Sequence, residues 1–175
     1  STYICHPSMA NDNLSGIIVA MSLISHFKKI KDLKKTIRFI FIPETIGSIA
    51  YINENLSELK SKVIGGYNLS CIGDDRVHSM ILTKYGNSTS DKSLLEVYKK
   101  FNIKPKIYSF LKRGSDERQF NSPGVDLSIT GICRSKYSNY PEYHTSMDNF
   151  NIVSLKGLSG GFKIAKQAIE ILQKK

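Results

Sequence analysis

The chain has 175 residues, enough for one domain with a buried core, and 41% of them are hydrophobic, a globular rather than a disordered composition. No apolar run approaches the roughly 20 residues of a membrane-spanning helix, so we expect no membrane partner. Lys and Arg outnumber Asp and Glu by 25 to 15, but the basic residues are dispersed and no nucleic-acid-binding motif accompanies them, so we expect no nucleic-acid partner.

The first part of the chain predicts two strands, each followed by a helix. Thr2–Cys5 holds the β-branched and bulky residues of a strand, and Leu14–Phe27 carries apolar residues at helical spacing. Thr36–Ile42 is a β-branched and aromatic run that ends at Pro43, as a buried strand would. A second helix is predicted over Thr45–Leu59.

The rest of the chain continues this alternation. A third strand is predicted over Val63–Ile72, and an amphipathic helix over Ser88–Phe101. Lys106–Leu111 predicts a short strand, Leu127–Arg134 predicts the last strand, and Leu155–Leu172 predicts a closing helix. Alternating strands and helices predict an α/β fold, in which a mostly parallel central sheet is covered by helices on both faces.

The cysteines and the start of the chain bear on its origin. Cys5, Cys71 and Cys133 show neither CxxC spacing nor an evident disulfide pairing, which predicts reduced, buried thiols in a cytoplasmic protein. The chain begins without Met and almost directly in a strand. We therefore expect a piece of a longer protein, whose N-terminal strands and other domains lie outside residues 1–175.

Conspicuous polar residues follow the ends of several predicted strands. His6 and Asp12 come after the first strand, Glu44 after the second, Asp75 after the third, and His144 lies in the loop after the last. In an open α/β sheet, ligands bind at the carboxyl ends of the strands, and imidazole and carboxylate groups are zinc ligands. The alternative for the first pair is a core histidine and a helix N-cap aspartate.

Several motifs occur in a recognisable order. They are CHPSMANDNLSG at 5–16, PETIGS at 43–48, RGSDERQ at 113–119 and RSKYSNYPEYHTSMDN at 134–149. This order resembles the co-catalytic zinc aminopeptidases, which share a superfamily with the glutaminyl cyclases. It is most similar to aminopeptidase-like proteins that carry a winged-helix domain and are often named with polysaccharide biosynthesis. The resemblance implies a three-layer α/β/α zinc-peptidase-like fold, with residues 1–175 as the aminopeptidase-like catalytic domain.

The resemblance also implies roles for individual residues. His6, Asp12 and His144 match zinc ligands of the family, and zinc with three protein ligands keeps an open position where it activates water. Glu44 would then be the general base that takes a proton from this water. In a competing assignment, Glu44 is a ligand and His6 orients the site; the base would then be Glu117, Glu142, Asp74 or Asp75.

The chain departs from the family pattern at three positions. Only Glu44 is present where the family has a Glu-Glu pair, Ser70 stands in place of a second aspartate, and Glu117 replaces a histidine. Because a serine hydroxyl is a poor zinc ligand, we expect one zinc ion rather than two. Further residues near the motifs could contact substrate or orient the ligands, namely Asp75, Glu117, Arg118, Arg134 and Tyr143.

Two functions from different classes agree with these residues. The first is a zinc-dependent hydrolase of the aminopeptidase type, acting on a small peptide or another amide with a free amine. The second is a metal-stabilised module with lost or altered activity, linked to surface polysaccharide biosynthesis. Both bind metal, so activity would separate them.

Overall fold

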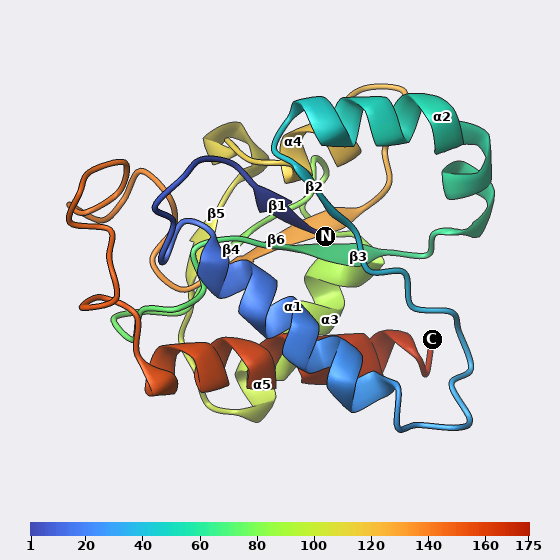
Figure 1. Cartoon of the computed structure of the whole chain (residues 1–175). Helices are drawn as coiled ribbons and strands as arrows, with labels where there is room; N and C mark the ends of the chain where they lie inside the picture. Colours follow the sequence, from blue (N-terminus) through green and yellow to red (C-terminus); the bar gives the residue numbers. More distant parts are fainter.

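A six-stranded sheet runs through the computed structural model, which describes all residues from 1 to 175 (Figure 1). The strand order is β2-β1-β3-β6-β4-β5. Strands β4 and β6 pair antiparallel, and the other neighbouring strands pair parallel, which confirms the mostly parallel sheet. The strands are β1 (Thr2–Ile4), β2 (Phe41–Pro43), β3 (Gly66–Leu69), β4 (Ser79–Ile81), β5 (Lys106–Tyr108) and β6 (Ile129–Cys133).

Helices cover both faces of this sheet and make three layers (Figure 1). Helices α1 (Leu14–Phe27), α3 (Thr89–Lys100) and α5 (Leu155–Leu172) lie on one face. Helix α2 (Ile46–Lys62) and the short α4 (Glu117–Phe120) lie on the other. None of the helices combines the length and the apolar character needed to cross a bilayer.

The two faces of the sheet are packed unequally. A cluster of 16 buried residues joins the sheet to α1, α3 and α5, whereas the cluster under α2 and α4 has only five. The larger cluster contains Leu23 of α1, Leu94 of α3, Ile164 of α5 and Ile132 of β6, together with residues of β3 and β4. Most of the apolar burial that stabilises the fold therefore lies on the three-helix face.

Helices α1 and α5 cover the predicted residues, while the strands are shorter than predicted. The run Thr36–Ile42 contributes only its last two residues to β2, because β2 is an edge strand whose single neighbour, β1, is three residues long. Strand β4 was not predicted. Its antiparallel direction depends on pairing with β6, a contact between segments far apart in the sequence.

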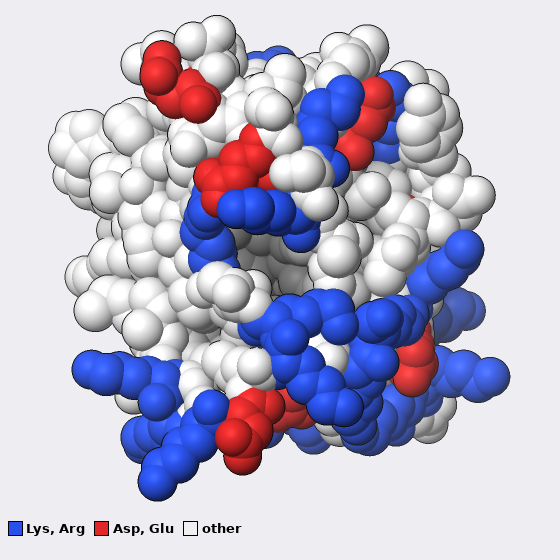
Figure 2. Space-filling model, turned by 90° about the vertical axis from the view of Figure 1, so that its right-hand side faces the viewer, with Lys and Arg blue, Asp and Glu red and all other residues white.

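A hollow opens near the amino ends of the strands. It has a volume of about 540 Å³ and a mostly apolar lining that includes Leu23, Tyr67 and Ile129. Figure 2 shows Lys and Arg side chains around its mouth, and Lys35 and Arg38 are among its lining residues. This hollow lies at the edge of the sheet opposite the carboxyl ends, where the sequence predicts the metal site.

Candidate metal centre

The loop that follows β1 carries the first two predicted ligands. It runs from residue 5 to residue 13 and leads directly into α1. The backbone N–H groups of Asn11 and Asp12 donate to the two carboxylate oxygens of Asp148, at 2.7 and 3.1 Å. Asp148 lies in the loop that also contains His144, so one carboxylate joins two segments that are far apart in the sequence.

The Asp12 carboxylate is buried and its two oxygens face different partners. The Tyr3 hydroxyl donates to Oδ1 at 2.7 Å, and the Cys71 thiol lies 3.7 Å from the same oxygen. The other oxygen, Oδ2, lies 3.2 Å from Nε2 of His144. Asn13 is the N-cap residue of α1, so the alternative reading of Asp12 as a helix cap is wrong.

Ser70, at the position where the resemblance to the zinc aminopeptidases implies a second aspartate, is linked to Asp12 through Tyr3. Its hydroxyl lies 2.7 Å from the Tyr3 hydroxyl, which in turn bonds Asp12 Oδ1. Both Tyr3 and Ser70 are about 1% exposed. The Asp12 oxygen that points away from His144 is therefore surrounded by the Tyr3 hydroxyl, which Ser70 contacts from behind, and by the Cys71 thiol.

His6 and His144 approach each other from separate loops. Their ring centroids are 5.5 Å apart in an edge-to-face arrangement, and the His144 ring stacks on Tyr143 with centroids 3.9 Å apart. Both histidines line an open cavity of about 760 Å³ together with Asp148. His6 is half-buried at this cavity, so it is not the enclosed core histidine of the alternative reading.

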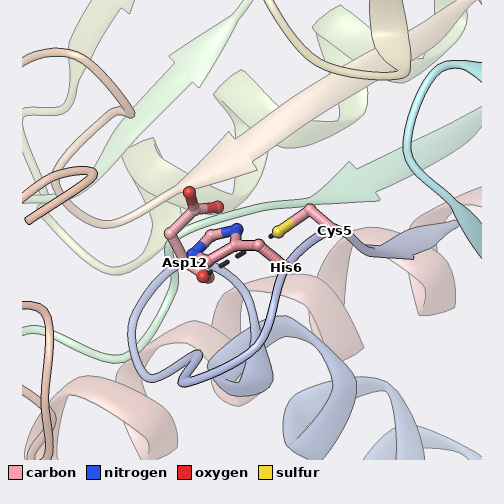
Figure 3. Close-up of side chains that lie close together, drawn as sticks. All are labelled: Cys5, His6 and Asp12. Atoms are coloured by element: carbon pink, nitrogen blue, oxygen red, sulfur yellow. Dashed lines mark hydrogen bonds between the residues drawn. The ribbon is translucent and has the colours of Figure 1, made fainter.

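Cys5 joins these residues, although it was not predicted as a ligand. One donor atom from each of Cys5, His6 and Asp12 lies within 4.8 Å of the others, and Figure 3 shows the three side chains gathered at the end of β1. The thiol is half-buried, which corrects the prediction that it is buried. Burial and the charges of Asp12 and Glu44 raise the pKa of Cys5 to about 12. The position directly before His6 was the sequence signal for this residue.

Glu44 follows β2 and is half-buried. Loss of hydration raises the pKa of its carboxyl group to about 7, and the negative charges of Asp12, Asp116 and Glu117 add to the rise. A hydrogen bond with Ser115 opposes it. A carboxyl group with a pKa near 7 can take up and release a proton at neutral pH, which is what a general base requires.

Two further carboxylates lie close to Glu44. Asp116 accepts hydrogen bonds through Oδ1 from the Thr45 N–H at 2.8 Å and the Ser48 hydroxyl at 2.9 Å, while its buried Oδ2 has no partner. Glu117 accepts from the N–H groups of Gly114 and Ser115, from the Asn68 amide and from the Tyr137 hydroxyl. With these four donors, the Glu117 carboxylate fixes the loop that contains Gly114 and Ser115.

The donor set suits a zinc ion. Imidazole, carboxylate and thiol groups are the ligands that zinc takes in proteins. The carboxylates of Asp12, Asp116 and Glu117 all raise the pKa of Glu44, and one buried oxygen among them, Oδ2 of Asp116, lacks a partner. A divalent cation would offset this accumulation of negative charge.

The structure does not bring every predicted residue to this centre. Asp75 is exposed, with a carboxylate oxygen 4.0 Å from the Lys156 ammonium, and Arg118 is exposed as well. Arg134 is buried, where its Nε donates to the Asp74 carbonyl oxygen at 2.8 Å and its guanidinium contacts His78. These contacts hold the Arg134 side chain inside the fold, so it does not face the candidate metal centre. Tyr143, in contrast, lies directly against His144.

The acids of the competing assignment are also engaged elsewhere. Asp74 accepts hydrogen bonds from the Ser135 N–H and hydroxyl, both at 2.8 Å, and from the Asn11 amide. Glu142 forms a two-pronged ion pair with Arg76, at 2.7 and 2.8 Å, which lowers the pKa of Glu142 to about 2. Among these acids, Glu44 is therefore the one whose pKa suits proton transfer beside the candidate ligands.

Comparison with known proteins gives a consistent picture. The family model described as "Domain of unknown function (DUF4910)" matches residues 1–175. A protein of Clostridium acetobutylicum, named as a candidate polysaccharide biosynthesis protein with an aminopeptidase-like domain, is 37% identical over 173 residues. That match covers 99% of this chain and 39% of the relative. The resemblance inferred from the motifs is thereby confirmed.

Solved structures share the fold. A candidate peptidase from Clostridium acetobutylicum superposes with a TM-score of 0.93 at 38% identity, covering 98% of this chain and 40% of that one. A zinc aminopeptidase from Bacillus subtilis gives 0.78 at 21% identity, covering 98% of this chain and 45% of that one. The second likeness shows the fold alone. The chain spans about two fifths of the length of the named Clostridium protein and of the solved Clostridium structure.

Proposed function

The chain belongs to the family described as "Domain of unknown function (DUF4910)", and from this membership and the candidate centre we propose that it forms the metal-binding part of a zinc-dependent hydrolase of the aminopeptidase type. One observation carries the proposal. His6, Asp12 and His144 meet from two loops at the carboxyl edge of the sheet, near a glutamate with a pKa of about 7. The aminopeptidase-like name of the Clostridium relative supports the reaction class.

The residues have separate roles in this proposal. His6, Asp12 through Oδ2, and His144 would hold the ion, which supplies Lewis-acid activation of water when bound. Glu44 takes a proton from the attacking water and returns it to the leaving amine. Tyr143 stacks on the His144 ring and so limits the directions in which this exposed ligand can point.

A single zinc ion suits this chain better than two. The Asp12 oxygen that a second ion would share accepts a hydrogen bond from Tyr3, and Tyr3 also meets Ser70. The residue after Glu44 is Thr45, so no second glutamate is available there. Only one side of the Asp12 carboxylate, the side that faces His144, is left for a metal.

The charge of the centre bears on the substrate. The carboxylates near Glu44 attract a positively charged group, and the free amine of a small peptide or of another amide is such a group. The open cavity beside His6 and His144 leaves room for it. We therefore propose an amine-bearing amide as the substrate class.

A second candidate function rests on the positions at which the chain departs from the zinc aminopeptidase pattern. Tyr3 and Ser70 fill the interior side of Asp12 with hydroxyl groups where the family has a metal-binding carboxylate. Such a change also suits a metal-stabilised binding module that serves surface polysaccharide synthesis without hydrolysis. The name of the Clostridium relative supports this link.

The first test is the zinc content of the dialysed chain, measured by elemental mass spectrometry. We expect one zinc ion per chain in the wild type, loss of zinc in His6→Ala and His144→Ala, and retention in Glu44→Ala. His26→Ala is the matched control, because His26 lies on α1 and pairs with Glu170. Absence of zinc from the wild type would overturn the proposal, and loss in Glu44→Ala would make Glu44 a ligand.

Hydrolysis of an aminoacyl anilide then separates the two candidate functions. A hydrolase should lose at least about 100-fold in rate in Glu44→Ala while its zinc content is unchanged, because general acid–base catalysis contributes that much. A wild type that binds zinc and hydrolyses no amide would favour the binding module.

A further inference from the structure

The third donor of the cluster at the end of β1 is a thiol that the family resemblance does not include. We propose that the Cys5 thiolate is a ligand of the same zinc ion as His6 and Asp12, an inference that rests on the proposed metal site. When the sulfur–zinc bond forms, the thiol proton leaves to water. The site is then a mixed sulfur, nitrogen and oxygen centre rather than a set of histidines and carboxylates.

The backbone explains how neighbouring residues reach one ion. In a strand, consecutive side chains point to opposite faces, but β1 ends at Ile4, so Cys5 and His6 are released from this alternation. Their donor atoms and an oxygen of Asp12 lie within 4.8 Å of one another (Figure 3). Zinc ligands lie about 2.0 to 2.3 Å from the ion, so donors of one tetrahedral site are about 3.3 to 3.8 Å apart. The donor atoms therefore need to approach one another by at most about 1.5 Å to bind one ion.

The Cys5 thiol has no strong partner that would hold it elsewhere. Its contacts are the Met9 sulfur at 3.9 Å and the Asp12 carbonyl oxygen at 4.0 Å. Cys71, in contrast, is fully buried and contacts Tyr140 and the interior oxygen of Asp12. Cys133 lies within β6. Cys5 is thus the one half-buried thiol of the chain, and it lies in the cluster with His6 and Asp12.

The chain lacks the carboxylates that would complete the family's ligand set, since Ser70 and Thr45 stand in their places. A thiolate from Cys5 makes up for one lost ligand. With His144 it would bring the protein donors to four, the number found in structural zinc sites. Cys5 therefore bears directly on the choice between a hydrolase and a binding module. A thiolate also favours zinc and cobalt over manganese and magnesium.

Cobalt(II) substitution tests the proposal through absorption spectra, without relying on activity. The chain, stripped of metal and loaded with cobalt(II), should show visible ligand-field bands and a near-ultraviolet sulfur-to-cobalt charge-transfer band. In Cys5→Ser the charge-transfer band should vanish and zinc affinity should fall by at least about tenfold, while some cobalt still binds. Cys133→Ser is the matched control and should keep both the ligand-field bands and the charge-transfer band.

The possible outcomes are distinct. Cobalt bound with ligand-field bands alone in the wild type would overturn the Cys5 assignment and leave the proposed metal site intact. A charge-transfer band that survives Cys5→Ser but disappears in Cys71→Ser would also overturn it. No cobalt or zinc binding at all would overturn both proposals.

A measurement on the wild type covers the case in which Cys5→Ser does not fold. At about pH 9, iodoacetamide should alkylate Cys5 slowly in the metal-free chain, because burial keeps most of this thiol protonated, and one equivalent of zinc should slow the modification at least about tenfold further, because a zinc-bound thiolate is shielded from the reagent. Mass spectrometry of the digested chain locates the label. An unchanged rate at Cys5 in the zinc-loaded chain would contradict the proposal.

Discussion

At the scale of single residues, Glu44 shows how burial sets a chemical property. Its pKa is raised from 4.5 to about 7, mainly because the half-buried carboxyl group loses hydration. The unfolded chain gives up this proton near pH 4.5, whereas the folded chain keeps it up to about pH 7. The folded state therefore binds more protons in this interval, and its free energy of unfolding falls as the pH rises.

This leads to a prediction for the metal-free chain. As the pH rises from 4.5 to 7, deprotonation of Glu44 should lower the free energy of unfolding. The pKa shift sets an upper bound of about 3 kcal/mol on this loss, and the partial solvation of the carboxyl group makes the actual loss smaller. Glu44→Gln should remove this loss, so it should be more stable than the wild type at pH 8. Urea unfolding at several pH values measures the difference. Glu54→Gln, an exposed change on α2, is the control and should keep the wild-type slope.

Residues also differ in how much of their role local sequence reveals. Glu117 and Arg134 lie in conspicuous motifs, yet both are held by internal hydrogen bonds. Cys5 has the opposite character, since its pattern indicated only a buried thiol and the structure places it beside His6 and Asp12. Whether a polar group is free to act depends on its partners, which come from distant parts of the chain.

At the scale of elements, Asp148 couples the two loops that carry the candidate ligands. It accepts from the backbone of Asn11 and Asp12 and from the Tyr140 hydroxyl. We expect Asp148→Ala to weaken zinc binding by about 10 to 100-fold, because partners that orient ligands have effects of this size. Isothermal titration calorimetry with zinc measures the change. Asn149→Ala, in the same loop, should bind zinc like the wild type, since its side-chain bonds are local.

The packing of α5 gives a second prediction at this scale. A Cβ atom at Gly157 would lie 2.0 Å from the backbone oxygen of Gly73, whereas one at Gly160 would lie 2.9 Å from a side-chain nitrogen of Arg134, a much milder overlap. Gly157→Ala should therefore lower the free energy of unfolding by about 1 to 3 kcal/mol. Gly160→Ala should change it by less than about 1 kcal/mol, because helix propensity compensates. Urea unfolding compares the two, and equal effects would contradict this account.

At the scale of the whole molecule, the two ends of the strands carry sites of different polarity. The candidate metal centre lies at the carboxyl ends of the strands, and the apolar hollow rimmed by Lys and Arg lies at the amino ends (Figures 1 and 2). The excess of basic residues, which gives a formal charge of +10, is thus partly gathered away from the carboxylates of the centre.

The sequence alone determined the α/β class, the position of α1 and α5, the family, and the residues from which a metal site could be built. These features depend on local periodicity and on short motifs, which are read from neighbouring residues. Tertiary structure decided the antiparallel pairing of β4 with β6 and the three-residue length of β2. It also decided which hydroxyl groups lie beside Asp12 and where the Cys5 side chain lies. Strand pairing, burial and hydrogen-bond partners depend on contacts between distant segments, and no local pattern specifies them.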